Sequence, residues 1–212
     1  MKRYFKFVAY VIVAIAFSTS HAGAYDDFFA AVARDDDRTV AQLLQRGFDP
    51  NSRDPAGQTG LILALRDEAP RVSEALWKSP QLDVNTENAS GENALMMAAL
   101  RGHLDWMRRL LERGARPHKD GWSPIHYAAT GPETKAVTLL LERGAPVDAR
   151  SPKQDTPLML AARYGAEASV DLLLARGASA VATNDRNLDA ADMARAEGRD
   201  YLVARIEKSV KR

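Results

Sequence analysis

The sequence predicts an all-α fold in which short helix-turn-helix repeats stack into a solenoid. The main evidence is a phrase of the form Leu-Leu-x-Arg-Gly, which occurs four times and ends at Gly47, Gly114, Gly144 and Gly177. The last three glycines follow one another at roughly 33 residues, and the interval before them is about twice as long, as if one copy were missing. A regular period of this length indicates stacked repeats, because each repeat buries its apolar face only against its neighbours.

The Leu-Leu-x-Arg-Gly phrase has the composition of a helix end. The leucines are its last buried positions, and arginine suits the negative end of the helix dipole. Glycine then takes the left-handed conformation that closes a helix at little steric cost. In the repeat without this phrase, we expect the helix to run through Ala75–Lys78 and to end at Ser79–Pro80, since proline cannot continue a helix.

A second phrase has the composition of a helix start and follows most closing glycines at the same interval, as from Gly47 to Thr59 and from Gly144 to Thr156. Its first residue is Ser, Thr, Asn or Asp, which caps the free N–H groups of the first turn. Proline follows in two copies, at the first helical position, where its missing N–H matters least. A pair of small alanines then allows two helices to approach closely. The expected caps are Thr59, Asn93, Ser123, Thr156 and Asp189.

Together these phrases resemble the ankyrin repeat: a β-turn finger, a capped first helix of the Thr-Pro-Leu-His type, and a second helix ending in Leu-Leu and Gly-Ala. The resemblance covers residues 25–212 and implies an ankyrin-repeat solenoid. Its first repeat lacks the Thr-Pro opening and its last lacks the Gly-Ala ending, as expected of capping repeats whose outer faces meet water. The six expected repeats are 25–54, 55–88, 89–120, 121–151, 152–185 and 186–212.

Residues 1–24 have the composition of a secretory signal peptide. A basic start is followed by an unbroken apolar run, Phe7–Phe17, and by an Ala-x-Ala sequence that ends at Ala24. We expect cleavage after Ala24 and a periplasmic location for the mature chain. The alternative is an uncleaved membrane anchor, although the run is shorter than the roughly 20 residues that span a bilayer. The chain has no cysteine, so neither a lipid anchor at the cleavage site nor a disulfide is available.

Charge argues against a nucleic-acid partner. The chain carries 29 basic and 28 acidic residues. Cleavage of the leader removes three basic residues and no acidic one, so the mature chain has 26 basic and 28 acidic residues and a net charge of −2. We interpret Asp35–Asp37 as helix capping and solvent exposure. The expected mature protein is a monomer that binds neither nucleic acid nor membrane.

Motifs for chemistry are absent from the sequence. The mature chain has three histidines, His103, His118 and His126, and no pair has the spacing of a helical metal site. His126 occupies the histidine of the Thr-Pro-Leu-His phrase, and the resemblance implies that it bonds the backbone between repeats. We find neither a nucleophile elbow nor a phosphate-cradling loop. We therefore expect no enzyme activity, no catalytic residue, no cofactor and no metal.

The connector between the third and fourth repeats is unusually short. The interval from Gly114 to Ser123 is three positions shorter than the interval between closing glycine and cap in the other repeats. Trp122 lies just before the helix cap. Either Trp122 packs on the neighbouring finger, or it bounds a notch that receives a partner.

The resemblance implies that the concave face and the finger tips bind another protein. This surface contains Arg, Tyr and Trp, which are enriched at binding hot spots. Two alternatives stay open: a protective envelope protein without a single ligand, and an exported effector that binds a foreign protein. The expected partner-binding residues are Arg66, Leu100, Arg101, Trp122, Arg163 and Tyr164. Other ligand-facing positions are Gln58, Asp67, Glu92, Thr130 and Asp155.

Overall fold

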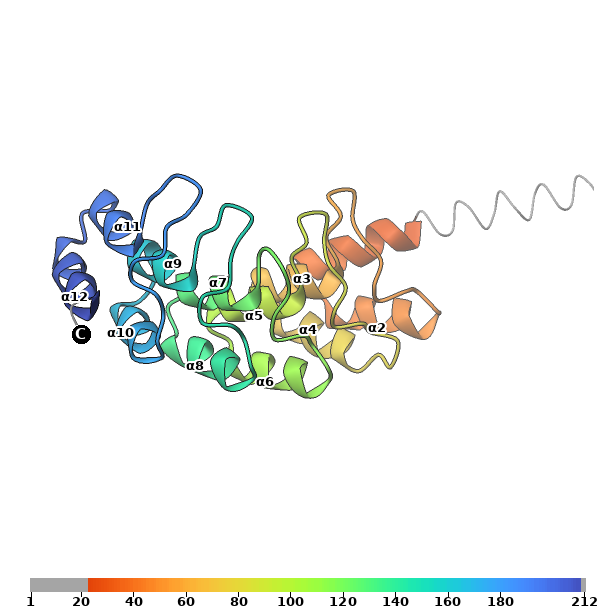
Figure 1. Ribbon diagram of the computed structural model, residues 1–212. Coiled ribbons are helices and arrows are strands. Elements are labelled where there is room, and N and C mark those ends of the chain that lie inside the picture. Colours follow the sequence, from red (N-terminus) through yellow and green to blue (C-terminus); the bar gives the residue numbers. More distant parts are fainter. Residues whose placement is uncertain (1–22, 211–212) are drawn as a thin grey trace, which may run out of the picture. The chain divides into compact units, whose positions relative to one another are not determined.

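The computed structural model describes residues 23–210 and divides the chain into two compact units, Met1–Asp83 and Val84–Arg212 (Figure 1). Each unit is described by itself. The described residues are helical apart from turns and one isolated bridge, Arg53–Thr59, so the all-α prediction is confirmed. Of the predicted signal peptide, only residues 23 and 24 lie within the described part, where they are helical. A search of that part finds no helix long and apolar enough to cross a membrane.

The first unit holds the first two helix pairs. Residues 23–33 pair with α2 (Asp37–Gln45), and α3 (Gly60–Arg66) pairs with α4 (Pro70–Trp77). Its core includes Phe28, which is fully buried and stacks on Phe48 with 4.5 Å between ring centroids. A Cβ built at Gly60 would lie 2.8 Å from the Phe28 ring, so glycine here lets the first repeat pack closely on α3.

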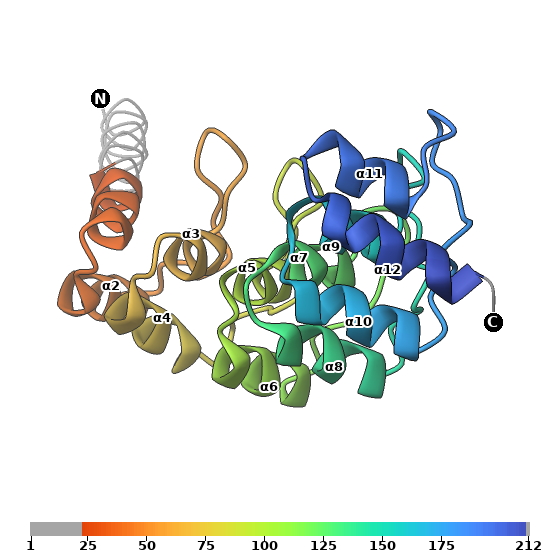
Figure 2. The same ribbon diagram turned by 90° about the vertical axis from the view of Figure 1, so that its left-hand side faces the viewer.

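The second unit stacks four further pairs in two rows. The inner row is α5 (Ala94–Arg101), α7 (Pro124–Thr130), α9 (Pro157–Tyr164) and α11 (Ala190–Ala196). The outer row is α6 (Leu104–Glu112), α8 (Thr134–Glu142), α10 (Glu167–Ala175) and α12 (Asp200–Val210). Neighbouring helices within each row are in contact, as Figure 2 shows. Fully buried side chains between the rows include Leu95, Met107, Ile125, Leu140 and Leu158.

The predicted helix ends are confirmed. Each of the five expected caps precedes the first helical residue, and the side chains of four of them accept a backbone N–H from the first turn. All four closing glycines have φ between +85° and +94°. The second helix of the second repeat, α4, ends at Trp77 with Lys78 as its cap, one residue earlier than expected. Pro80 lies midway in sequence between Gly47 and Gly114, one repeat from each, so it takes the place of the missing glycine.

In the second unit, the carboxyl end of an inner helix is covered by the repeat that follows. A Cβ built at Gly131 would lie 2.7 Å from the carbonyl oxygen of Leu100, and one at Gly165 would lie 2.0 Å from that of Ala129. The last repeat uses a side chain instead: the Arg199 guanidinium donates to the carbonyl oxygens at the end of α9. These acceptors are Ala161 at 3.0 Å, Ala162 at 3.0 Å and Gly165 at 2.9 Å.

Candidate protein-binding face

Four long fingers share one hydrogen-bonded turn. The residue five places before the helix cap accepts, through its side chain, the backbone N–H groups two and four residues later. Its own backbone N–H donates to the carbonyl oxygen four residues on, at 2.8 to 3.0 Å. A fixed turn of this kind holds each finger in one conformation. The residues that build it are Asp54, Asn88, Ser151 and Asn184.

The short finger, residues 115–122, departs from this pattern. His118 takes the position of the turn-building residue, and among the described fingers only the four long ones make the hairpin bond. The missing residues also remove a link between fingers. Asn85 bonds the Gly114 carbonyl and the Arg116 N–H of the next finger, both at 2.9 Å, and Asp148 accepts from Ser179 at 3.0 Å. Among the described residues of the short finger, none makes the equivalent bond to the finger that follows.

Other contacts hold the short finger. The Lys119 ammonium lies 2.6 Å from the Glu87 carboxylate and donates to the Gly91 carbonyl at 3.0 Å. At its far end, the Nδ1 atom of His126 accepts the Ser123 N–H at 3.1 Å, so Nε2 donates to the Ala149 carbonyl at 3.0 Å. Burial lowers the pKa of His126, which is consistent with a neutral ring. The structural role expected of His126 is confirmed.

A small groove opens beside the short finger. It has a volume of about 170 Å³ and is lined by Leu100, Trp122, His126, Tyr127 and Thr130. The Trp122 ring meets His126 edge to face, with centroids 5.6 Å apart, and Tyr127 similarly at 6.2 Å. Trp122 is half-buried. It therefore packs against its own repeat and also forms a wall of the groove.

The Tyr127 hydroxyl fixes this wall to the preceding finger. It donates to Glu92 Oε1 at 2.7 Å, while Asn88 donates to Glu92 Oε2 at 2.7 Å. Burial raises the pKa of Tyr127 above its usual value, and the bond to Glu92 adds to the shift. Sequence reasoning missed Tyr127 as a groove residue. Its place directly after the buried histidine, in the first helical turn below the finger, was the available signal.

The structure brings two of the predicted binding residues together, Leu100 and Trp122. Arg101 follows Leu100 at the end of α5 and is exposed. Arg163 and Tyr164 end α9. Arg163 lies 2.8 Å from the Glu197 carboxylate and 4.7 Å from the Tyr164 ring centroid, and Tyr164 is 52% exposed.

Arg66 belongs to the first unit, whereas the other predicted binding residues belong to the second. Its guanidinium makes two bonds to the neighbouring Asp67 carboxylate, at 2.8 and 2.9 Å. Its charge is therefore partly offset by its own neighbour, within the unit that contains it.

The expectation that Asp155 faces a ligand is wrong. Asp155 is only 7% exposed, and its Oδ1 atom accepts the Asn184 side-chain N–H at 2.8 Å. Its carboxylate thus links two neighbouring fingers. Glu92 is likewise occupied by Tyr127 and Asn88. Acidic residues at finger bases serve here to join repeats, because a buried carboxylate requires hydrogen-bond partners.

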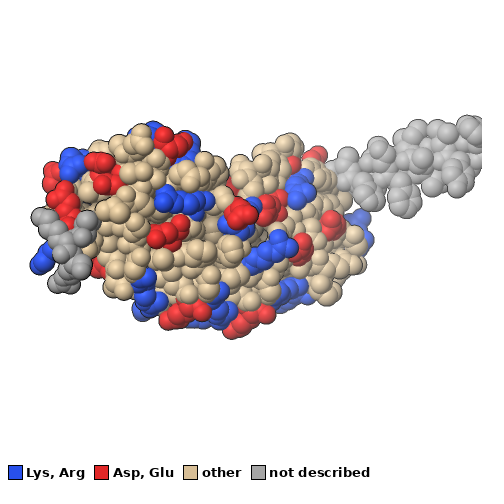
Figure 3. All heavy atoms as spheres, viewed as in Figure 1, with Lys and Arg blue, Asp and Glu red and all other residues tan. Residues whose placement is uncertain are grey.

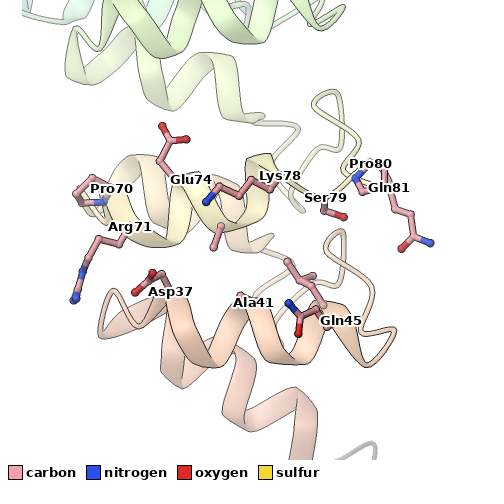
Figure 4. A pocket seen from close by; sticks show the side chains of 12 residues that line it. Asp37, Ala41, Gln45, Pro70, Arg71, Glu74, Lys78, Ser79, Pro80 and Gln81 are labelled. Carbon is pink, nitrogen blue, oxygen red and sulfur yellow. The ribbon is translucent and has the colours of Figure 1, made fainter.

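A second, larger groove lies within the first unit between α2 and α4, on the outer helices (Figure 4). Its volume is about 770 Å³. Ala41 on α2 and Ala75 on α4 leave it open. The position of Ala75 is held by Leu139 and Leu172 in two later repeats, and both leucines are half-buried. The groove also contains Asp37, Leu44, Gln45, Pro70, Arg71, Glu74, Lys78, Ser79, Pro80 and Gln81.

Charged side chains of both signs are interspersed on the face shown in Figure 3. Within residues 23–210, no group of three or more His, Cys, Asp or Glu side chains is arranged to hold a metal ion. The groove beside the short finger is lined mainly by apolar and aromatic side chains, with Thr130 and the buried His126 beside them.

Comparison with known families decides the assignment. A family model described as ankyrin repeats (3 copies) matches residues 28–120 and 109–184. The chain belongs to the ankyrin-repeat family. Stacked ankyrin repeats generally mediate protein–protein interaction.

Curated relatives share the repeats within longer proteins. The chain is 28% identical over 159 residues to human transient receptor potential cation channel subfamily A member 1, covering 70% of this chain and 14% of that protein. It is 34% identical over 151 residues to human SH3 and multiple ankyrin repeat domains protein 2, and this match covers 68% of this chain and 8% of that protein. It is 32% identical over 155 residues to the mouse B-cell lymphoma 3 protein homolog, and this match covers 70% of this chain and 35% of that protein.

Proposed function

We propose that this ankyrin-repeat chain is a non-enzymatic binding module that engages a protein partner through its inner face. The observation that carries the proposal is the groove of Leu100, Trp122 and Tyr127 beside the short finger. Half-buried apolar and aromatic side chains around an open groove are the composition of a binding hot spot. Arg101 and Tyr164 add exposed residues of suitable type at the ends of two inner helices, α5 and α9.

The scaffold supports this role because it is rigid where contacts would be made. The long fingers carry fixed turns, and the groove walls are held by the bonds of Tyr127 to Glu92 and of His126 to Ala149. A surface fixed before binding loses little conformational entropy when a partner docks. The family context favours a protein over a small molecule or nucleic acid as the partner.

We further propose that the chain acts in the periplasm after removal of residues 1–24. The support is the leader sequence, with its basic start, apolar run and Ala-x-Ala site. Amino-terminal sequencing of the protein from a periplasmic fraction tests this. A mature chain that begins at Tyr25 is the expected result, and a chain that retains Phe7–Phe17 would contradict it.

The binding role is tested by crosslinking and pull-down with the mature chain as bait. A second bait carries Arg101→Glu, Trp122→Ala and Tyr164→Ala. A matched control bait carries changes at exposed positions away from the inner-helix ends, Arg143→Glu and Val181→Ala. We expect a specific protein to be held by the first and control baits and lost by the second.

The other outcomes separate the alternatives. Equal capture by all three baits would retain the binding role and move the site away from this face. Capture of nothing specific would argue against a defined periplasmic partner and favour a diffuse protective role. Recovery of the protein outside the cell envelope would favour an effector that binds a foreign protein.

A further inference from the structure

We propose that the groove beside the short finger binds one large apolar side chain, such as Leu, Ile, Met or Phe, from an extended segment of the partner. This inference rests on the proposed function and specifies what the face recognises. It is carried by three features of the second unit: the size of the groove, the state of its polar atoms, and the missing finger residues.

The size of the groove matches a single side chain. Its volume is about 170 Å³. A cavity of about 150 Å³ is enough to hold a benzene molecule, and each water molecule takes about 30 Å³ of liquid. The groove therefore accommodates one side chain of the size of leucine or phenylalanine and is too small for a helix.

The polar side-chain atoms of three lining residues, His126, Tyr127 and Thr130, are already engaged within the chain. Both His126 nitrogens are hydrogen-bonded, the Tyr127 hydroxyl donates to Glu92, and the Thr130 hydroxyl donates to the His126 carbonyl at 2.9 Å. What remains is hydrocarbon from Leu100, the aromatic rings of Trp122 and Tyr127, and one donor, the indole N–H of Trp122. A polar side chain entering here would lose hydration and would find the Trp122 indole N–H as its only side-chain partner in the lining, so an apolar one is favoured.

A quaternary ammonium group is the other ligand that aromatic rings attract. The side chains that line the groove include no carboxylate, which favours an apolar side chain over a cation.

The short finger provides the entrance. A finger of ordinary length would place three more residues before Trp122, and those residues would close a hairpin of the kind seen at Asn88 and Ser151. Beside the short finger, the Trp122 ring is half-buried next to Leu100. An extended segment can pass along the inner face at this point and insert one side chain between them.

The proposal is tested by selecting binders from a random peptide library displayed on phage, with the mature chain as target. Selected peptides are counter-screened against Leu100→Asp and Trp122→Ala. A matched control target carries Val181→Asp, at a position that is 63% exposed on a different finger. Circular dichroism and urea unfolding of each variant establish that it is folded.

We expect the selected peptides to share one large apolar residue. Its replacement by alanine should weaken binding about 10- to 100-fold, as expected when a buried aliphatic or aromatic side chain is lost. Binding should fall similarly with Leu100→Asp and be unchanged with Val181→Asp. Trp122→Phe, which retains an aromatic wall, should restore most of the affinity lost with Trp122→Ala.

Several results would overturn the inference. One is a peptide consensus dominated by charged residues, or by trimethyl-lysine when the library contains it. The others are a peptide affinity that Leu100→Asp leaves unchanged, and a library that yields no binder. The proposed function fails separately, in the pull-down. A partner captured there whose binding survives Leu100→Asp would leave the binding role intact and refute this account of the groove.

Discussion

Replacing Gly165 by alanine tests how closely adjacent repeats approach. Gly165 lies between α9 and α10 with φ of −84° and ψ of −177°, a conformation that alanine adopts without strain. An added Cβ would nevertheless lie 2.0 Å from the Ala129 carbonyl oxygen and 2.9 Å from the Ala161 Cα atom. Any loss of stability therefore measures the steric clash of the added methyl group with α7 and α9, separately from the backbone preference of glycine.

The magnitude follows from the size of the clash. Carbon and carbonyl oxygen normally stand about 3.3 Å apart or more, so the methyl group requires a shift of roughly 1.3 Å. Both obstructing atoms are backbone, so no side chain can rotate away. Overpacking in a close-packed interior typically costs about 1 to 3 kcal/mol. We expect the Gly165→Ala change to lie at or above the upper end of this range, at about 3 kcal/mol.

The matched control is Gly144→Ala. A Cβ at Gly144 meets nothing within 4 Å, but φ is +85°, so this change costs only the backbone preference, about 1 kcal/mol. Urea unfolding followed by circular dichroism compares the two variants. With a slope of about 2 kcal/mol per M, their midpoints should differ by about 1 M. If the Gly165→Ala variant is at least as stable as the Gly144→Ala variant, the inference that adjacent repeats approach closely at Gly165 is wrong.

Three further changes address the last repeat, the buried histidine and the outer groove. Arg199→Ala should lower the free energy of unfolding, measured with urea, by about 2 kcal/mol. Arg199→Lys should recover little of this loss, because an ammonium group cannot reach three carbonyl oxygens as a guanidinium does. Full recovery with lysine would contradict this geometry. Burial lowers the pKa of His126, so the unfolded chain binds a proton first and stability should fall as pH drops below about 6.5. This part of the pH dependence should vanish in His126→Gln and persist in His118→Asn, and an unchanged profile in His126→Gln would refute it. Ala75→Leu should stabilise the chain by about 1 kcal/mol by partly filling the groove between α2 and α4, whereas Ala196→Leu, at an exposed site, should give no gain.

The repeat architecture could be predicted from sequence because the same local chemistry recurs in register. A capping Thr, Asn or Asp and a closing glycine each act within one helical turn, so their effects are legible without tertiary information. Gly47 and Thr156 adopt the expected conformations for this reason. Pro80 could be read as a helix stop, and its place midway between Gly47 and Gly114 puts it in the register of the missing glycine.

The candidate site was harder to predict because it depends on contacts between repeats. Asp155 looks like a solvent-facing acid in sequence, but it is buried against the amide of Asn184 on the next finger. Tyr127 looks like a core aromatic, and its hydroxyl reaches Glu92 on the preceding finger. Leu100 and Trp122 were predicted as binding residues because each breaks a local pattern: an apolar residue where a solvent-facing one is expected, and an aromatic residue beside a shortened loop.

The short finger shows how a local loss becomes a feature of the surface. Removing three residues deletes the finger-to-finger bond that Asn85 and Asp148 make elsewhere, and it deletes the hairpin turn. The repeat stays in register because Lys119 bonds backward to Glu87 and His126 bonds forward to Ala149. These contacts hold the short finger to its neighbours without replacing the bulk of the missing residues. Trp122 is therefore held in place and left half-exposed, which is the combination that a preformed binding groove requires.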